Sequence, residues 1–129
     1  MTIERLDHIN IRTPDLKKTE AFFMDILGLT KGWRPDFNFP GSWLYCGEQA
    51  VVHLVGVKAS GQTEDAALDH FAFYVSGFDD VVKKLKKHKY KYDARVVPNS
   101  GRRQVFLQDP NGVRVELNFA SAAEEAKAA

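Results

Sequence analysis

The chain has little of several features that mark large classes of proteins. Its 129 residues include one cysteine, Cys46, so an internal disulfide is excluded. Its hydrophobic runs stay shorter than the ~18 residues that a membrane-spanning helix needs, and the chain opens without the pattern of a signal peptide. We therefore expect a cytoplasmic protein that does not act at a membrane.

An excess of charge of one sign is also missing. Eighteen lysines and arginines stand against 17 aspartates and glutamates, which leaves a formal net charge of +1. This balance argues against a surface that binds nucleic acid. The one basic run, KKLKKHKYKY, has the mixed pattern of the solvated face of a helix, and His88 within it is expected to be a surface residue.

What the sequence does contain is a repeat. Leu-Asp-His occurs at residues 6–8 and again at 68–70, and a shift of 62 residues places His8 on His70. Each copy leads into a run in which apolar and polar residues alternate, as in a half-buried strand. We therefore predict one structural unit built twice, each time in the order strand, helix, strand, strand, strand.

In the first copy we expect a strand over residues 3–12 and a helix that begins near Thr13 or Asp15 and ends at Gly28. A loop is expected over 31–42. Two further strands follow, around 43–47 and 50–57.

In the second copy the expected elements are, in order, a strand over 68–75, a helix over 77–90, a short strand over 92–98, and the two strands of a hairpin over 103–108 and 113–119. The hairpin turns at Asp-Pro-Asn-Gly, residues 109–112. Small polar residues at 58–67 predict the linker between the copies. The tail, 120–129, is expected to be a loose or short helical end without function.

The last strands of the two copies also align. A shift of 63 residues matches Trp43 with Phe106 and His53 with Glu116. Because a strand with this alternation sends its apolar neighbours to the side that the helices can cover, the polar residues point to the opposite face.

Four polar side chains are thereby predicted to share one face of the sheet: His8, His53, His70 and Glu116. An uncompensated carboxylate on a half-buried face is costly, and a divalent metal would compensate it. Imidazole and carboxylate ligands suit iron, manganese, nickel, cobalt or zinc. His53 is the least secure member of the set.

At these residues the sequence resembles a known family. LDHINIRTPDLKKTEAFFMDILGL is similar to the first strand and helix of the vicinal oxygen chelate superfamily, and VFLQDPNGVRVEL to its last hairpin. That superfamily includes glyoxalases, bleomycin and fosfomycin resistance proteins, epimerases and extradiol dioxygenases. The resemblance implies an α+β fold in which two βαβββ modules form a cupped, half-open mixed β-barrel with helices outside.

The resemblance also implies the domain organisation and the metal ligands. A single domain would comprise a first module at about 3–57, a linker at 58–67, a second module at 68–119 and the tail at 120–129. His8, His70 and Glu116 would bind one divalent metal. That metal would chelate two neighbouring oxygens of a small substrate and stabilise developing negative charge.

His53 bears on the subclass. In glyoxalase I the matching strand usually carries a glutamate, whereas extradiol dioxygenases place a histidine beside the metal as an acid or base, so extradiol-dioxygenase-like chemistry with His53 as the catalytic residue is slightly favoured. Phe106 stands where such enzymes often have a tyrosine, and the chain lacks their second paired-module domain. A glyoxalase- or epimerase-like isomerase or lyase, and a bleomycin-resistance-type binding protein without catalysis, are the alternatives.

Six residues are predicted to contact the substrate: Asn10, Arg34, Trp43, Tyr74, Phe106 and Arg103. Asn10 and Tyr74 share the face of the predicted ligands. Arg34 lies in the aromatic loop that precedes Trp43, which either lines a pocket for an aromatic or anionic substrate or is simply packed on itself. Arg103 suits a carboxylate or phosphate, or else serves the surface loop.

Exposed strand edges and the resemblance together predict a homodimer. In such a dimer each metal site would be built either within one chain or from two chains. The expected partner is otherwise a small-molecule substrate.

Overall fold

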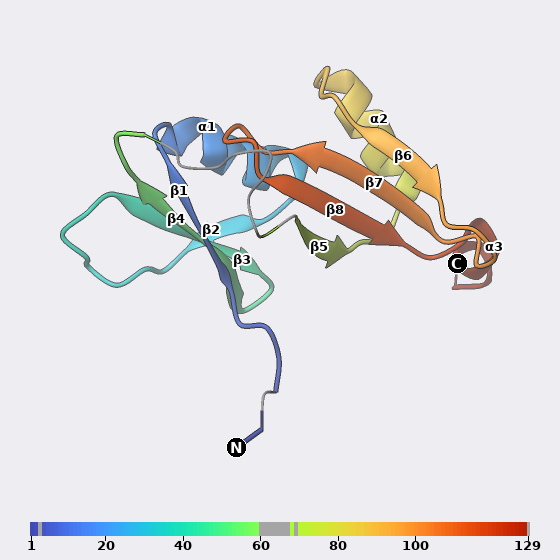
Figure 1. The fold of residues 1–129 in the computed structure, drawn as a ribbon, viewed down its shortest axis with the longest axis horizontal. Coiled ribbons are helices and arrows are strands. Elements are labelled where there is room, and N and C mark those ends of the chain that lie inside the picture. The colour runs from blue at the N-terminus through green and yellow to red at the C-terminus, as the bar shows by residue number, and fades with distance from the viewer. Residues whose placement is uncertain (3, 60–67, 69, 129) are drawn as a thin grey trace. The chain divides into compact units, whose positions relative to one another are not determined.

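A computed structural model describes residues 1–2, 4–59, 68 and 70–128 (Figure 1). The chain divides into two compact units, residues 1–61 and 62–129. The first unit contains, in order, β1 (Ile9–Thr13), α1 (Leu16–Ala21), the π-helical turn η1 (Phe22–Ile26), β2 (Thr30–Gly32), β3 (Gly41–Cys46) and β4 (Gln49–Gly56). The second contains β5 (Phe71–Tyr74), α2 (Phe78–Lys87), β6 (Asp93–Val96), β7 (Arg103–Gln108), β8 (Arg114–Phe119) and α3 (Ala122–Ala128). The predicted linker lies outside the described residues except for Lys58 and Ala59.

Both units form a four-stranded mixed sheet with the same topology. The strand order is β1-β4-β3-β2 in the first sheet and β5-β8-β7-β6 in the second. In each sheet the first strand runs parallel to the last, and the other neighbours are antiparallel. The predicted α+β fold class with a doubled βαβββ unit is therefore confirmed.

The register of the two sheets matches residue by residue. Trp43 is the cross-strand partner of His53, and Phe106 is the partner of Glu116. Val52 lies opposite Ile9, and its counterpart in the second unit lies opposite Phe71 in the same way. The alignment drawn from the sequence is thus the alignment of the folded strands.

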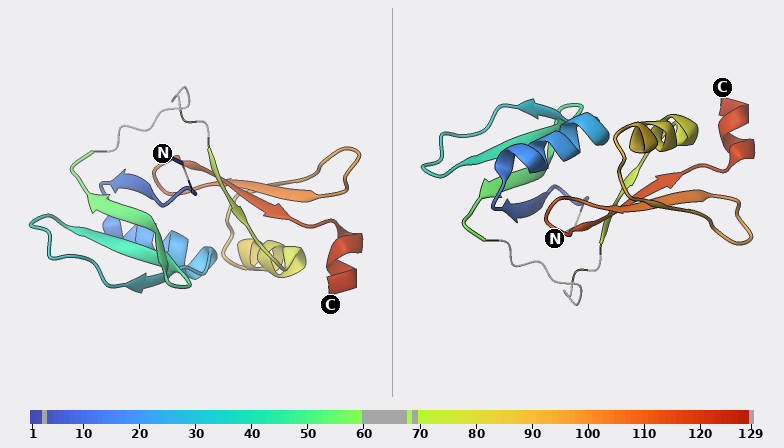
Figure 2. Two further views of the ribbon diagram at one scale, coloured as in Figure 1. Left: turned by 90° about the horizontal axis from the view of Figure 1, so that it is seen from below. Right: turned by 90° about the horizontal axis from the view of Figure 1, so that it is seen from above.

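Each sheet packs one face against its own helix (Figure 2). In the first unit α1 lies against β3 and β4, and the buried residues include Ile11, Phe23, Leu44 and Leu54. The second unit buries side chains of β7 and β8 together with Leu85 of α2. This burial of apolar area is the main stabilising term, and it leaves the opposite face of each sheet to polar side chains.

The first helix begins and ends as the sequence predicts, but its last turn is wider than that of an α-helix. Asp15 is the N-cap and accepts a hydrogen bond from the Lys18 amide at 3.0 Å, and Gly28 adopts the left-handed conformation (φ 77°) that stops the helix. Between them the helix widens into η1, where the Leu27 amide bonds to the Phe22 carbonyl at 3.3 Å. The helical spacing in the sequence predicted a helix that stops at Gly28, but it gave no sign of the π-helical turn.

The loop expected over 31–42 is shorter than predicted. Its start belongs to β2, which pairs with β3, and Gly41 and Ser42 belong to β3 itself. A strand as short as β2 has too few residues to show the alternation of apolar and polar side chains from which a strand is predicted. Its pairing with β3 therefore decides its extended conformation. At Gly32 a side chain would collide with the Tyr45 ring, because a Cβ would lie 2.6 Å from Tyr45 Cε1.

The tail forms a capped helix. Ser121 Oγ accepts from the Glu124 amide at 3.1 Å, and the Glu124 carboxylate accepts from the Ser121 amide at 3.0 Å. This reciprocal pair is a capping box, which satisfies two amides at the start of α3.

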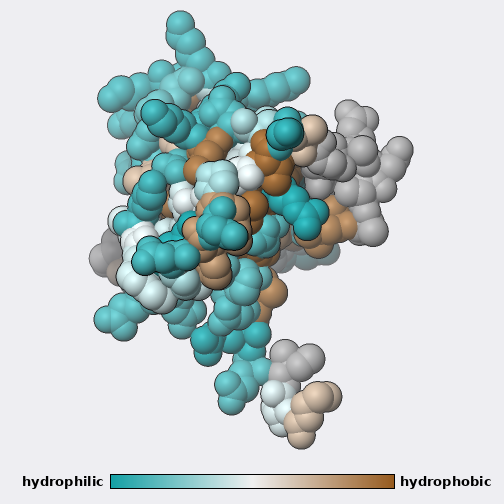
Figure 3. Space-filling model, turned by 90° about the vertical axis from the view of Figure 1, so that its left-hand side faces the viewer, coloured by the Kyte–Doolittle hydropathy of each residue, from teal (hydrophilic) through white to brown (hydrophobic). Residues whose placement is uncertain are grey.

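Among the described residues no helix is long and apolar enough to cross a membrane. On the face shown in Figure 3 hydrophilic residues predominate, and apolar residues emerge in separate patches.

The predicted hairpin turn is held by one side chain. Asp109 is buried, and its Oδ1 accepts hydrogen bonds from the amides of Asn111 at 2.8 Å and Val113 at 2.9 Å. Burial raises the pKa of Asp109 above its usual 3.8, although the hydrogen bonds from Asn111 and Val113 oppose the shift. The carboxylate therefore organises the β7–β8 turn at some cost in desolvation.

We expect Asp109→Ala to lower the free energy of unfolding by about 2 kcal/mol, because two partly buried amides lose their acceptor. Asp109→Asn keeps an oxygen for those amides and should cost less than about 1 kcal/mol.

The raised pKa of Asp109 also sets the direction in which stability changes with pH. The cost of ionising Asp109 in the folded protein is absent below pH 3.8, and it grows as the pH rises through the folded-state pKa, so the free energy of unfolding falls over that range. Asp109→Asn should remove that part of the pH dependence. Urea denaturation across pH measures both effects, and equal losses for the two variants would contradict this role.

Candidate functional site

In the first unit the structure brings two predicted residues together. His8 directly precedes β1, and His53 lies in the middle of β4, which runs parallel to β1. Their rings stack with centroids 3.8 Å apart and an interplanar angle of 14°. Because β4 also pairs with β3, the Trp43 ring stacks on the other side of His53 at 4.0 Å and 9°. His53 is therefore held between an imidazole and an indole.

Hydrogen bonding orients His8. Its Nδ1 donates to Asp7 Oδ2 at 2.7 Å, and this hydrogen bond lowers the pKa of the Asp7 carboxyl. A neutral His8 with its proton on Nδ1 carries a lone pair on Nε2, which is the arrangement that metal-binding histidines adopt when a carboxylate holds the other nitrogen. Asp7 thus orients the His8 ring, a contact that the sequence pattern did not predict.

Burial, followed by repulsion from the His8 ring whenever that ring is protonated, lowers the pKa of His53 below its usual 6.5. A neutral imidazole results at neutral pH. A pocket of about 550 Å³ opens beside the stack, and its lining includes Arg5, Tyr45 and the three stacked rings. The first unit therefore presents an aromatic wall with one oriented histidine at its edge.

The second unit repeats this arrangement with one chemical change. His70 directly precedes β5, and Glu116 lies on β8, which runs parallel to β5. His70 Nε2 is 3.6 Å from Glu116 Oε2. The position that is a histidine in β4 is a carboxylate in β8, so each unit supplies one pair of ligand-type side chains.

Two amides hold the Glu116 carboxylate. Gln104 Nε2 donates to Oε1 at 2.8 Å, and Asn118 Nδ2 donates to Oε2 at 3.1 Å. Glu116 is buried, so these hydrogen bonds partly compensate its desolvation. Asn118 could have been found from the sequence, since it lies two residues beyond Glu116 on the same face. Gln104 could be found only from the strand register, which places it opposite Asn118.

The pair of His70 and Glu116 fits a divalent metal by its chemistry and by its spacing. Ligand atoms that each lie about 2.1 Å from a metal are roughly 3–3.5 Å from one another, close to the separation of His70 Nε2 and Glu116 Oε2. The amide donors to Glu116 and the carboxylate that accepts from His8 are contacts of the kind that orient metal ligands in proteins. Among the described residues, neither unit by itself gathers three His, Cys, Asp or Glu side chains around one point.

The other predicted contact residues fall into two groups. Asn10 and Tyr74 are exposed on their strands, on the face predicted for them. Arg34 is held within its own loop, where its guanidinium lies 5.0 Å from the ring centroids of both Phe37 and Phe39 and donates to the Phe39 carbonyl at 3.0 Å. These contacts favour the packed-loop interpretation, and a role of Arg34 in substrate binding stays a prediction.

Arg103 contacts the C-terminal helix. Its Nε donates to the Ala120 carbonyl at 3.2 Å, a terminal nitrogen pairs with Glu125, and its guanidinium lies 4.5 Å from the centroid of the Phe78 ring. The Arg103 side chain is only 12% exposed. These contacts explain the position of the Arg103 side chain without a substrate.

Phe106, by contrast, lies opposite Glu116 on the neighbouring strand, and its ring approaches the His70 ring edge-on, with centroids 6.1 Å apart.

Comparison with known proteins identifies the family. Residues 5–117 match the model of the Glyoxalase/Bleomycin resistance protein/Dioxygenase superfamily. The chain belongs to this superfamily. The resemblance seen in the sequence is thereby confirmed over nearly the whole chain.

Three relatives in the superfamily illustrate its range. The chain is 31% identical to YaeR of Escherichia coli (strain K12), with 89% of this chain and 95% of YaeR covered. It is 30% identical to a metapyrocatechase of Geobacillus stearothermophilus, but it spans only 37% of that protein. It is 25% identical to the lactoylglutathione lyase of Salmonella typhimurium, with 88% of this chain and 90% of the lyase covered.

A solved structure agrees with the fold. A glyoxalase family protein from Bacillus anthracis superposes with a TM-score of 0.78 at 22% identity, covering 94% of this chain and 98% of its own. At this level of identity the superposition supports the superfamily fold alone.

The contacts of Arg103 generate a stability prediction. We expect Arg103→Ala to lower the free energy of unfolding by about 1–2 kcal/mol, because a largely buried guanidinium and its partners lose their contacts. Arg102→Ala, an exposed neighbour, should change it by less than about 0.5 kcal/mol. A double-mutant cycle with Glu125→Ala should show a coupling of about 0.5–1 kcal/mol. A stable Arg103→Ala protein would return Arg103 to the list of substrate contacts.

Proposed function

We propose that the protein is a metal-dependent enzyme that binds a small substrate through two neighbouring oxygen atoms. His8, His70 and Glu116 hold one divalent metal, which is iron, manganese, nickel, cobalt or zinc. When bound, this metal polarises the two oxygens and stabilises the negative charge that develops on them. Three protein ligands leave positions open for the substrate.

The observation that carries this proposal is the matched pair of half-sites. Glu116 is fixed by two amide donors beside His70, and His8 is oriented by Asp7 at the equivalent place in the other unit. Such outer contacts are expected around ligands, whereas a surface histidine has no need of them. The complete site combines both units, within one chain or across a homodimer.

The protein's own residues supply the rest of the chemistry. The two amides keep Glu116 turned toward His70, and the stack on Trp43 holds the His53 ring in one orientation. From that position His53 moves a proton to or from the substrate. Asn10, Tyr74 and Phe106 contact the substrate on the same faces of the two sheets.

Between the reaction types we favour extradiol-dioxygenase-like chemistry. The supporting observation is that the residue at position 53 is a histidine held in a stack, where a glutamate would be expected of a glyoxalase I. The similarity to a metapyrocatechase over 89% of this chain agrees with that choice. The similarity to a lactoylglutathione lyase over 90% of that protein's length makes isomerase or lyase chemistry the second candidate.

We also propose that the protein is a homodimer in the cytoplasm. The strands β1 and β2 form the edges of the first sheet, and β5 and β6 those of the second. Sheet edges offer unpaired backbone groups to a second copy.

The metal test uses single substitutions. We expect His8→Ala, His70→Ala and Glu116→Ala each to lower the bound metal roughly tenfold or more, because each removes one ligand. Gln104→Ala should weaken metal binding about 10- to 100-fold by releasing Glu116. His88→Ala is the matched control, since His88 lies at the end of α2 with its Nδ1 2.9 Å from the Lys84 carbonyl oxygen. Metal analysis after dialysis measures all five, and a Glu116→Ala protein with full metal content would overturn the assignment.

The reaction test is oxygen uptake by the metal-loaded protein with catechol as the probe. We expect His53→Ala to lower turnover about 10²- to 10⁴-fold while metal content is kept, because an acid or base is lost and no ligand is removed. Loss of metal together with activity would make His53 a fourth ligand instead. Metal binding without oxygen uptake would favour the isomerase or lyase, and a protein that binds no metal would favour the binding-protein alternative.

A further inference from the structure

We propose that Arg95 and Arg114 form an anion-binding subsite beside the metal, so that the substrate carries an oxyanion group, such as a carboxylate, in addition to its two neighbouring oxygens. This inference rests on the proposed function, because it describes the other end of the same substrate. Neither arginine was singled out in the sequence.

The strand register places both arginines on the face of Glu116. Arg114 lies two residues before Glu116 on β8, so their side chains share a face. Phe106 is the cross-strand partner of Glu116, and Gln104, which donates to Glu116, is the partner of Arg95 on β6. Three adjacent strands therefore contribute to one surface.

The ring of Phe106 holds the two guanidinium groups. The Cζ atom of Arg114 lies 4.5 Å from the ring centroid, and that of Arg95 lies 4.9 Å from it. A guanidinium over an aromatic face gains cation–π energy and loses freedom, so both groups are pre-organised. The same ring approaches His70 at 6.1 Å, which places the arginines next to the proposed ligands of the second unit.

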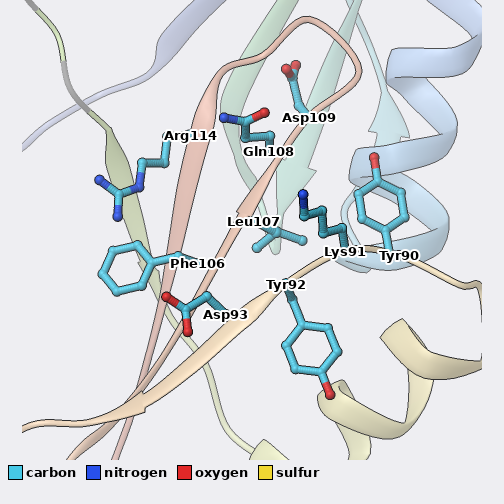
Figure 4. A pocket seen from close by; sticks show the side chains of 9 residues that line it. All are labelled: Tyr90, Lys91, Tyr92, Asp93, Phe106, Leu107, Gln108, Asp109 and Arg114. Carbon is cyan, nitrogen blue, oxygen red and sulfur yellow. The ribbon is translucent and has the colours of Figure 1, made fainter. Parts of the chain in front are cut away.

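A pocket of about 470 Å³ gives a ligand access to Phe106 and Arg114 (Figure 4). Arg95 is outside the lining of this pocket, but its guanidinium lies over the same Phe106 ring. Phe106, Asp93 and Arg114 lie together at one end of the close-up, and Tyr90 and Tyr92 lie at the other. Lys91 also lines the pocket. The lining thus combines aromatic surface with two cations, Lys91 and Arg114, and two carboxylates, Asp93 and Asp109. The aromatic surface suits a ligand with a flat or short apolar body, and the Arg114 guanidinium is the group that would meet its anionic end.

The charges of the described residues on this face balance until a metal is bound. On this face the two arginines stand against Asp93, whose Oδ2 is 2.6 Å from a terminal nitrogen of Arg95, and against Glu116. A divalent metal at Glu116 would make the sum of these charges positive. The planar guanidinium fork matches carboxylate and phosphate oxygens in particular.

The experiment compares two probes with the same chelating oxygens. Catechol and 3,4-dihydroxybenzoate differ by one carboxylate, and their affinities for the metal-loaded protein are measured by calorimetry. We expect the benzoate to bind at least tenfold more tightly than catechol. Arg114→Gln and Arg95→Gln should each remove most of that preference and leave the affinity for catechol within twofold. Arg114→Lys should keep part of it, and Arg102→Gln, an exposed loop variant, should keep all of it.

A second arm uses protein without metal, titrated with benzoate and with inorganic phosphate. We expect weak binding that Arg114→Gln abolishes and Arg102→Gln preserves, and the better of the two probes identifies the oxyanion. If the protein holds no metal but this arm succeeds, the proposed function fails and the subsite stands. If catechol binds to the metal-loaded protein but the carboxylate adds nothing, the subsite is wrong and the proposed function stands. Thermal unfolding of each variant shows that it is folded.

Discussion

The parallel pairing of the first strand of each unit with its last strand is the constraint on which the site depends. It places the residue that precedes β1 beside the middle of β4, and the residue that precedes β5 beside the middle of β8. His8 therefore meets His53, and His70 meets Glu116, although about 45 residues separate the members of each pair in the chain. The helix on the other face supplies the burial that holds these strands in register.

The two units use one geometry for different chemistry. The first surrounds its histidine pair with aromatic rings, and the stack on Trp43 makes the His53 environment partly apolar. The second surrounds its histidine and carboxylate with amides and guanidinium groups. A duplicated sheet can thus offer a proton-transfer group from one half and a charged, hydrogen-bonded ligand from the other, because identical register does not require identical side chains.

The arginines show how the face of the strand on which a side chain lies determines its contacts. Arg103 is the first residue of β7, and its side chain pairs with Glu125 of the tail and lies over the ring of Phe78 in α2. Arg95 and Arg114 lie on the strands at either side of β7 and meet over Phe106 instead. Their sequence contexts are alike, in that each is a cation in an alternating run. Their contacts differ because alternation places Arg103 on one face of the sheet and Arg95 and Arg114 on the other, and different side chains lie on each face.

The sequence by itself determined the duplication, the order of the elements, the faces of the strands and the pairing of His53 with Glu116 as equivalents, because periodicity and repetition are local properties that can be counted. Tertiary structure alone decided the π-helical end of the first helix, the short strand β2, the capture of Arg103 by the tail and the meeting of two arginines over one ring. Each of these features depends on a contact between residues that are distant in the chain. The local pattern of residues around either partner does not predict the energy of such a contact.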